Sequence, residues 1–192
     1  MNTSPDDGVT ADRADPALRV AALAIPVGAG LLVSLLLGLY AGLHVPTGRA
    51  VNLVGFSGPL AAKTWLTTIA VLFGLVQMVT AAGMWGRLGL GDASWTAPLH
   101  RWSGRLAVLV LLPVVAHCMY ALGFGFESPR VLIHSLLGCL FFGAFTAKML
   151  ALPRPDLPPW AIPVLGGVLS AALVGLWLTS ALWFFTTFGL TR

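Results

Sequence analysis

The chain has 192 residues, of which 57% are hydrophobic and only 9% are charged. Soluble domains carry about 25% charged residues, so this supply cannot cover a water-facing surface. The composition therefore predicts an integral membrane protein and excludes an ordinary soluble enzyme. Membrane topology and contact with lipid headgroups explain the formal charge of +4, and we expect no nucleic-acid partner.

Five apolar stretches are long enough to cross a lipid bilayer as helices, which takes roughly 20 residues each. They run approximately over 18–43, 60–85, 102–122, 131–152 and 160–185. Clusters of glycine, proline and polar residues separate them, as turns do. The sequence predicts an all-α fold: an integral membrane bundle of five transmembrane helices over residues 17–192, preceded by a polar cytoplasmic leader over residues 1–16.

The basic residues indicate how this bundle is oriented. With the amino terminus inside, the cytoplasmic side holds Arg13, Arg19, Arg87, Arg101, Arg105, Lys148 and Arg154, and the outer side holds Arg49, Lys63, Arg130 and Arg192. The excess on the inner side follows the positive-inside rule, and tryptophans near both boundaries suit an interfacial belt. We therefore expect a multi-pass protein of the cell membrane with a cytoplasmic amino terminus and an outer carboxyl terminus.

Two histidines occupy matching depths in neighbouring predicted helices. His117 lies about five residues before the end of the third helix and His134 about four residues after the start of the fourth, so each lies roughly 6 to 8 Å below the same boundary. Imidazoles at equal depth on separate helices can approach one haem iron from opposite faces. We predict that His117 and His134 are the metal ligands of one haem b, with two haems as the upper limit.

Small residues follow three of the histidines by one helical turn, on the same helix face. The pairs are His100 with Gly104, His117 with Ala121, and His134 with Gly138. A flat macrocycle pressed against a ligand helix needs such a lack of side chain, although small residues are also common wherever membrane helices pack. The candidate cofactor-binding residues are therefore His117, His134, Gly138, Ala121 and His100.

The stretch HRWSGRLAVLVLLPVVAH, which begins at His100, resembles a ligand helix of the ferric reductase and NADPH oxidase membrane domain. The resemblance extends over 100–148, and its first six residues are the specific part. It implies two stacked haems held by paired histidines. The stretches HSLLGCLFFGAFTAKML and GLWLTSALWFF are similar to an uncharacterised group of actinobacterial five-helix membrane proteins, and that likeness implies no function.

The chain also departs from the reductase pattern. The resemblance implies ligands about fourteen residues apart on nearly one helix face, whereas His100 and His117 are separated by about 100° on an ideal helix. A kink at Pro113 would change that angle. Lys148 stands where the fourth helix would carry a second histidine, and no flavin or nucleotide domain follows up to Arg192. We expect the haem component of a membrane oxidoreductase, with one outer haem that exchanges electrons with a quinone, ferric iron or a partner protein.

Other interpretations of the same residues stay open. His44 and His100 can serve as interfacial anchors, and buried imidazoles can hold helices together by hydrogen bonds. An outer copper site would need Cys118 and Met119 to converge with histidines, although adjacent helical side chains point about 100° apart. The apolar stretches contain no Asp or Glu, which disfavours a cation transporter. The main alternative is a haem-free structural or accessory subunit of a membrane complex.

Overall fold

The structure, a computed structural model, describes residues 16–50, 52, 55–89 and 93–191. Every element in those residues is a helix, which confirms the predicted all-α class. The elements are α1 (Pro16–Ala21), α2 (Ala24–Leu43), α3 (Pro59–Met84), α4 (Thr96–Ala116), the π-helix η1 (His117–Leu122), α5 (Pro129–Ala151), α6 (Ala161–Trp177), the π-helix η2 (Leu178–Leu182) and α7 (Trp183–Phe188). The predicted leader, apart from Pro16, lies outside the described residues.

Five helical stretches are long and apolar enough to cross a membrane, as the sequence predicts. They cover Ala17–Leu43, Pro59–Met84, Thr96–Leu122, Pro129–Ala151 and Ala161–Phe188. The third begins at Thr96, ahead of the expected start near Trp102, so His100 lies one turn inside a helix. By length and composition, the chain is a multi-pass membrane protein.

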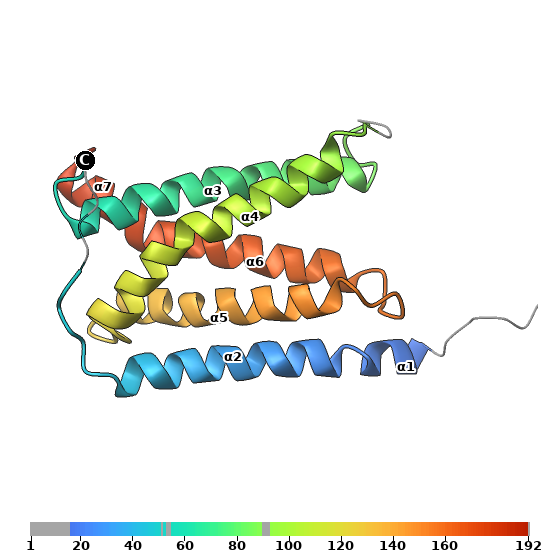
Figure 1. Ribbon diagram of the computed structural model, residues 1–192, viewed down its shortest axis with the longest axis horizontal. Helices are drawn as coiled ribbons and strands as arrows, with labels where there is room; N and C mark the ends of the chain where they lie inside the picture. The colour runs from blue at the N-terminus through green and yellow to red at the C-terminus, as the bar shows by residue number, and fades with distance from the viewer. Residues whose placement is uncertain (1–15, 51, 53–54, 90–92, 192) are drawn as a thin grey trace, which may run out of the picture.

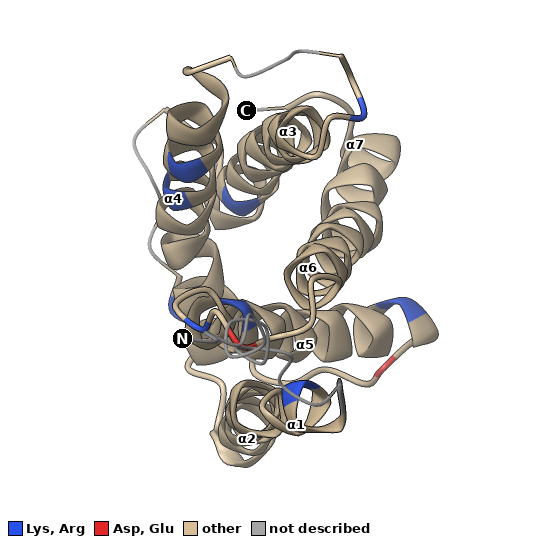
Figure 2. Cartoon of the chain, turned by 90° about the vertical axis from the view of Figure 1, so that its right-hand side faces the viewer, with Lys and Arg blue, Asp and Glu red and all other residues tan. Residues whose placement is uncertain are grey.

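The helices pack in an order that differs from their order in the chain. α2 packs on α5, α5 on α6, α6 on α3 and α3 on α4, while α4 and α5 make few direct contacts. Figure 1 shows α2 as the outermost helix beside α5, and Figure 2 shows α3, α4, α5 and α6 around a common axis with α2 outside them. The break in close packing therefore falls between α4 and α5.

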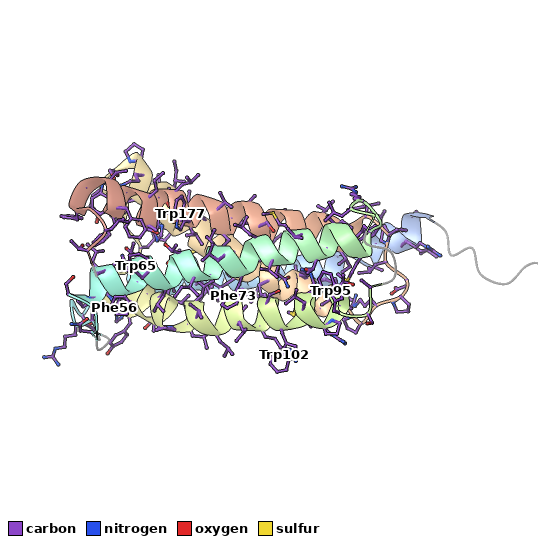
Figure 3. The ribbon with its side chains drawn as sticks, turned by 90° about the horizontal axis from the view of Figure 1, so that it is seen from above. Phe56, Trp65, Phe73, Trp95, Trp102 and Trp177 are labelled. Carbon is purple, nitrogen blue, oxygen red and sulfur yellow. The ribbon has the colours of Figure 1, made fainter. Side chains whose placement is uncertain are left out.

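Large apolar side chains remain exposed on the outer faces of the spans. On α2, Leu31 and Leu35 keep 64% and 57% of their surface exposed. An apolar surface of this extent suits contact with lipid chains. Figure 3 shows Trp65 and Trp95 toward opposite ends of the bundle and Trp102 projecting away from it, as expected of indoles in two interfacial belts.

Small residues let α2 and α5 approach each other closely. A Cβ built on Gly30 would lie 2.5 Å from the carbonyl oxygen of Gly143 and 3.0 Å from the Cβ of Ala147. A Cβ built on Gly143 would in turn collide with the Oγ of Ser34, which donates a hydrogen bond to the carbonyl of Cys139 at 3.0 Å. Backbones can come this close in a membrane only where side chains are minimal.

An apolar core lies at mid-depth in the bundle and separates two polar ends. Its buried members are Ala70, Leu111, Phe141, Ala172, Leu173 and Leu176. On α5, Phe141 lies midway between His134 and Lys148, so these two polar residues fall on opposite sides of the core. We call the end where α5 begins the His134 end and the opposite end, where α4 begins, the His100 end.

Candidate functional site

His134 is held on its Nδ1 side by a chain of hydrogen bonds from another helix. Its Nδ1 lies 3.0 Å from the Oγ1 of Thr179, and that hydroxyl donates its proton to the carbonyl of Gly175 at 2.7 Å. The hydroxyl has one proton, so it accepts at His134. The imidazole proton is therefore on Nδ1, and the Nε2 lone pair is not used by Thr179. This is the tautomer that a metal-ligating histidine with a hydrogen-bonded Nδ1 adopts.

A cavity of about 310 Å³ opens beside His134, between η1 and α5. Its walls are mainly apolar and come from every span, with Leu37 of α2, Leu60 of α3, Val115 of α4, Phe142 of α5 and Trp183 of α7 among them. The backbones of α4 and α5 make few close contacts, and the cavity lies beside the end of α4 and the start of α5. Its volume and apolar walls with few polar groups are typical of a small-molecule site.

Both π-helices border this cavity. Cys118, Met119 and Leu122 of η1 line one side of it, and Ser180 of η2 lines another. The turn in η1 follows Pro113, whose ring removes one backbone donor from α4. π-helical turns are uncommon and occur frequently at functional sites. The sequence indicates a kink at Pro113, but it gives no sign of the second π-helix.

The structure brings His117 to the same end as His134 without placing it on the cavity wall. His117 is the first residue of η1 and is half-buried. The positive charge of Lys63 acts on both His117 and His134. Its neighbours Cys118 and Met119 line the cavity, whereas His117 is not among the lining residues.

Of the three small residues expected beside a macrocycle, one faces open space. Gly138 lines the cavity, and a Cβ built there would have nothing within 4 Å. Ala121 is buried, with 3% of its surface exposed, and does not line the cavity. Gly104 makes room for the amide of Gln77, whose Nε2 would lie 3.1 Å from an added Cβ. Gly138 is therefore the small residue that leaves room for a ligand.

The His100 end repeats the hydrogen-bonding pattern of His134. The Nδ1 of His100 lies 3.0 Å from the Oγ1 of Thr80, which donates to the carbonyl of Val76 at 2.7 Å. By the same reasoning the proton is on Nδ1 and the Nε2 lone pair is free of Thr80. The side-chain amide of Gln77 donates to the carbonyl of His100 and, at 3.0 Å, to the Oγ of Ser103.

The second polar group also feels the charge of a cation on another helix, Lys148. Its Nζ lies 3.6 Å from the position of a Cβ on Gly166, between α5 and α6, and its charge acts on His100. Lys148 as a whole is half-buried.

His44 connects the end of α2 to η1 through a hydrogen bond and ring stacking. Its Nε2 donates to the carbonyl of Tyr120 at 3.1 Å, and its ring stacks between Tyr40 and Tyr120 with centroid distances of 5.2 Å. Thr47 and Gly48 add backbone bonds to Tyr120 and Ala121 at 3.2 and 3.1 Å. These contacts support the interpretation of His44 as an anchor at the end of α2.

Cys118 and Cys139 both line the cavity and are not joined in a disulfide. Among the described residues, no group of three or more His, Cys, Asp or Glu is placed to hold a metal ion. The copper alternative therefore gains no support from the part of the chain that the structure describes. A haem iron needs only two axial protein ligands, so this finding does not bear on it.

Sequence reasoning missed the residues that hold the histidines. Thr80 lies 20 residues from His100 in the chain and Thr179 lies 45 residues from His134, and nothing in a single sequence pairs them. Lys63 and Arg130 were interpreted through topology alone, yet both line the cavity. A hydroxyl inside an apolar helix was the available signal, because buried polar groups need hydrogen-bond partners.

These features define a class: a five-helix membrane protein with a mainly apolar cavity beside His134 at one end and a second hydrogen-bonded histidine, His100, at the other. Residues 23–192 match a family of unknown function, DUF6529, and the chain belongs to that family. No curated protein and no solved structure matches the chain.

Proposed function

We propose that this protein is a membrane-embedded b-type cytochrome that exchanges electrons with a quinone, ferric iron or a partner protein. The observation that carries the proposal is the pairing of His134 with Thr179. That pairing fixes the imidazole tautomer and leaves Nε2 available beside a cavity with apolar walls. The equivalent pairing of His100 with Thr80 supports the same chemistry at the other end, with two haems as the upper limit.

The residues around the cavity fit a haem in three respects. His134 offers a nitrogen ligand, Gly138 leaves open space one turn away, and apolar side chains such as Phe142 provide a dry wall. A bound haem would supply reversible one-electron chemistry at its iron. The protein would fix the imidazole through Thr179 and exclude water with its apolar walls. This wall composition would also influence the reduction potential.

The second residue that would hold the haem iron in this proposal is His117, as the sequence predicts. His117 lies at the same end of the bundle as His134, and the charge of Lys63 acts on both, although His117 does not line the cavity. Met119 is the structural competitor, because it lines the cavity from η1 and a thioether can also ligate haem iron. A substitution distinguishes His117 from Met119, since only the residue that ligates the iron is essential for the haem spectrum.

A reduced-minus-oxidised spectrum of protein purified from haem-sufficient cells tests the proposal. We expect a six-coordinate low-spin spectrum that His134→Ala and His117→Ala each abolish or severely weaken, because that state needs both nitrogens. His100→Ala should preserve it, since His100 lies about 25 Å of helix from His117. Met119→Leu is the matched control. A colourless wild type contradicts the proposal, and loss in Met119→Leu with retention in His117→Ala transfers the second ligand to Met119.

One observation favours the haem-free alternative, a structural or accessory subunit. The His134–Thr179 and His100–Thr80 contacts are themselves hydrogen bonds between different helices. Such bonds stabilise membrane bundles by about 0.6 kcal/mol on average. In that case His134→Ala would lower the stability of the bundle, while the wild type would show no Soret band and no change with dithionite.

We also propose that the bundle lies in the cell membrane with its amino terminus in the cytoplasm, so that the His134 end faces outward. The distribution of basic residues supports this orientation. Electrons would then be exchanged at the outer side.

A further inference from the structure

Two cations from different helices line the cavity at the His134 end. Lys63 belongs to α3 and Arg130 to α5, and both are half-buried. The charges of both act on His134, so the three groups share one electrostatic environment. Both lie near the starts of their helices, yet neither is fully exposed.

Neither cation is neutralised by the described part of the chain. The ammonium of Lys63 forms no hydrogen bond or ion pair there. Arg130 donates one N–H to the carbonyl of Thr179 at 2.7 Å, and its guanidinium lies over the ring of Trp183 at 4.1 Å. Its other N–H groups remain available to a ligand. Glu127 also lines the cavity, but it is exposed and pairs with neither cation among the described residues.

Lys63 and Arg130 lie where a positive charge does not stabilise its own helix. Lys63 lies near the start of α3 and Arg130 is the second residue of α5. The helix macrodipole is positive at the amino-terminal end, so a cation there is repelled and an anion is attracted. This effect applies to Arg130, in the first turn of α5, whereas Lys63 lies just beyond the first turn of α3. Two cations from different helices thus line one apolar cavity.

We propose that Lys63 and Arg130 bind the acidic head of an amphipathic ligand whose apolar body occupies this cavity. The recognised chemistry is a carboxylate or phosphate on an apolar body, whether from a tetrapyrrole or from an anionic lipid. Lys63 acts as a point charge and Arg130 as a planar fork with several donors. The inference goes beyond the proposed haem ligation, because it concerns the acidic head and needs no iron.

Two matched pairs of ligands test this proposal on the full-length protein in neutral detergent. Binding of phosphatidylglycerol is compared with that of phosphatidylcholine by native mass spectrometry. Binding of haem is compared with that of haem dimethyl ester by titration, since esterification removes both carboxylates. We expect at least one acidic ligand to bind with about a tenfold preference over its neutral counterpart.

Variants identify the residues responsible for that preference. Lys63→Gln and Arg130→Gln should each reduce it about tenfold, whereas Lys148→Gln, which removes a cation at the other end, should leave it unchanged. Glu127→Gln should strengthen acidic binding by removing a competing charge. Equal binding of acidic and neutral ligands in both pairs overturns the inference, as does an equal loss in Lys148→Gln.

The outcomes also separate this inference from the proposed function. A preference for phosphatidylglycerol without any haem binding would uphold the acidic-head site and contradict the cytochrome. Tight binding of haem and of its dimethyl ester alike, without a lipid preference, would uphold the cytochrome and contradict the acidic-head site.

Discussion

At the scale of single residues, Thr179 links two side chains of α5 to η2, one through its hydroxyl and one through its backbone carbonyl. Its Oγ1 accepts from His134, and its carbonyl accepts from Arg130 one turn earlier. Only the first bond depends on the side chain of Thr179. A substitution that removes the hydroxyl and keeps the shape therefore isolates the control of the His134 tautomer from the anchoring of Arg130.

We expect Thr179→Val to weaken haem binding by about 10- to 100-fold, the usual effect of removing the partner of a ligating histidine. Titration of apoprotein with haem measures this effect. Thr80→Val removes the equivalent hydroxyl at the His100 end and should leave the haem beside His134 unaffected. Unchanged haem affinity in Thr179→Val would show that this hydroxyl does not support a ligand.

At the scale of elements, α2 depends on α5 for its place in the bundle. The contact rests on Gly30 facing Gly143, where an added Cβ has no room. Gly28 lies two residues earlier on the same helix, and a Cβ there would meet nothing within 4 Å. The two glycines thus have different packing environments within one helix and form a matched pair.

We expect Gly30→Ala to destabilise the protein by about 1–3 kcal/mol, because overpacking forces the two backbones apart. Gly28→Ala should leave stability unchanged or raise it slightly, since alanine has a higher helix propensity than glycine. Thermal unfolding in detergent, followed by circular dichroism, measures both. Equal midpoints for the two variants would contradict the close α2–α5 contact.

At the scale of the whole molecule, an odd number of spans requires the termini to lie on opposite sides of the membrane. We expect a reporter that is active only in the cytoplasm to work at the amino terminus and to fail at the carboxyl terminus. Fusions that place both termini on one side would refute five spans. The reversed result, with the carboxyl terminus inside, would keep five spans and contradict the proposed orientation.

The spans themselves could be predicted from the sequence because hydrophobic length is a local property. Every span agrees with its expected position to within a few residues, except that α4 begins at Thr96 instead of near Trp102. The start of α4 includes the polar residues His100 and Arg101, which lower the local hydropathy and hide the first turn. Depth along a helix could be predicted for the same reason, so His117 and His134 were correctly assigned to one end of the bundle.

Only the tertiary structure decided which helices are neighbours and which way the side chains turn. The sequence does not encode locally that α2 packs on α5, that α4 and α5 leave a cavity, or that Thr179 meets His134. By depth alone, either His117 or Met119 could be the ligand opposite His134. In the structure, Met119 of η1 lines the cavity and His117 does not. The physical reason is that hydrophobicity fixes how a chain enters a membrane, whereas close packing and hydrogen bonds between helices fix the rotation of each helix about its axis.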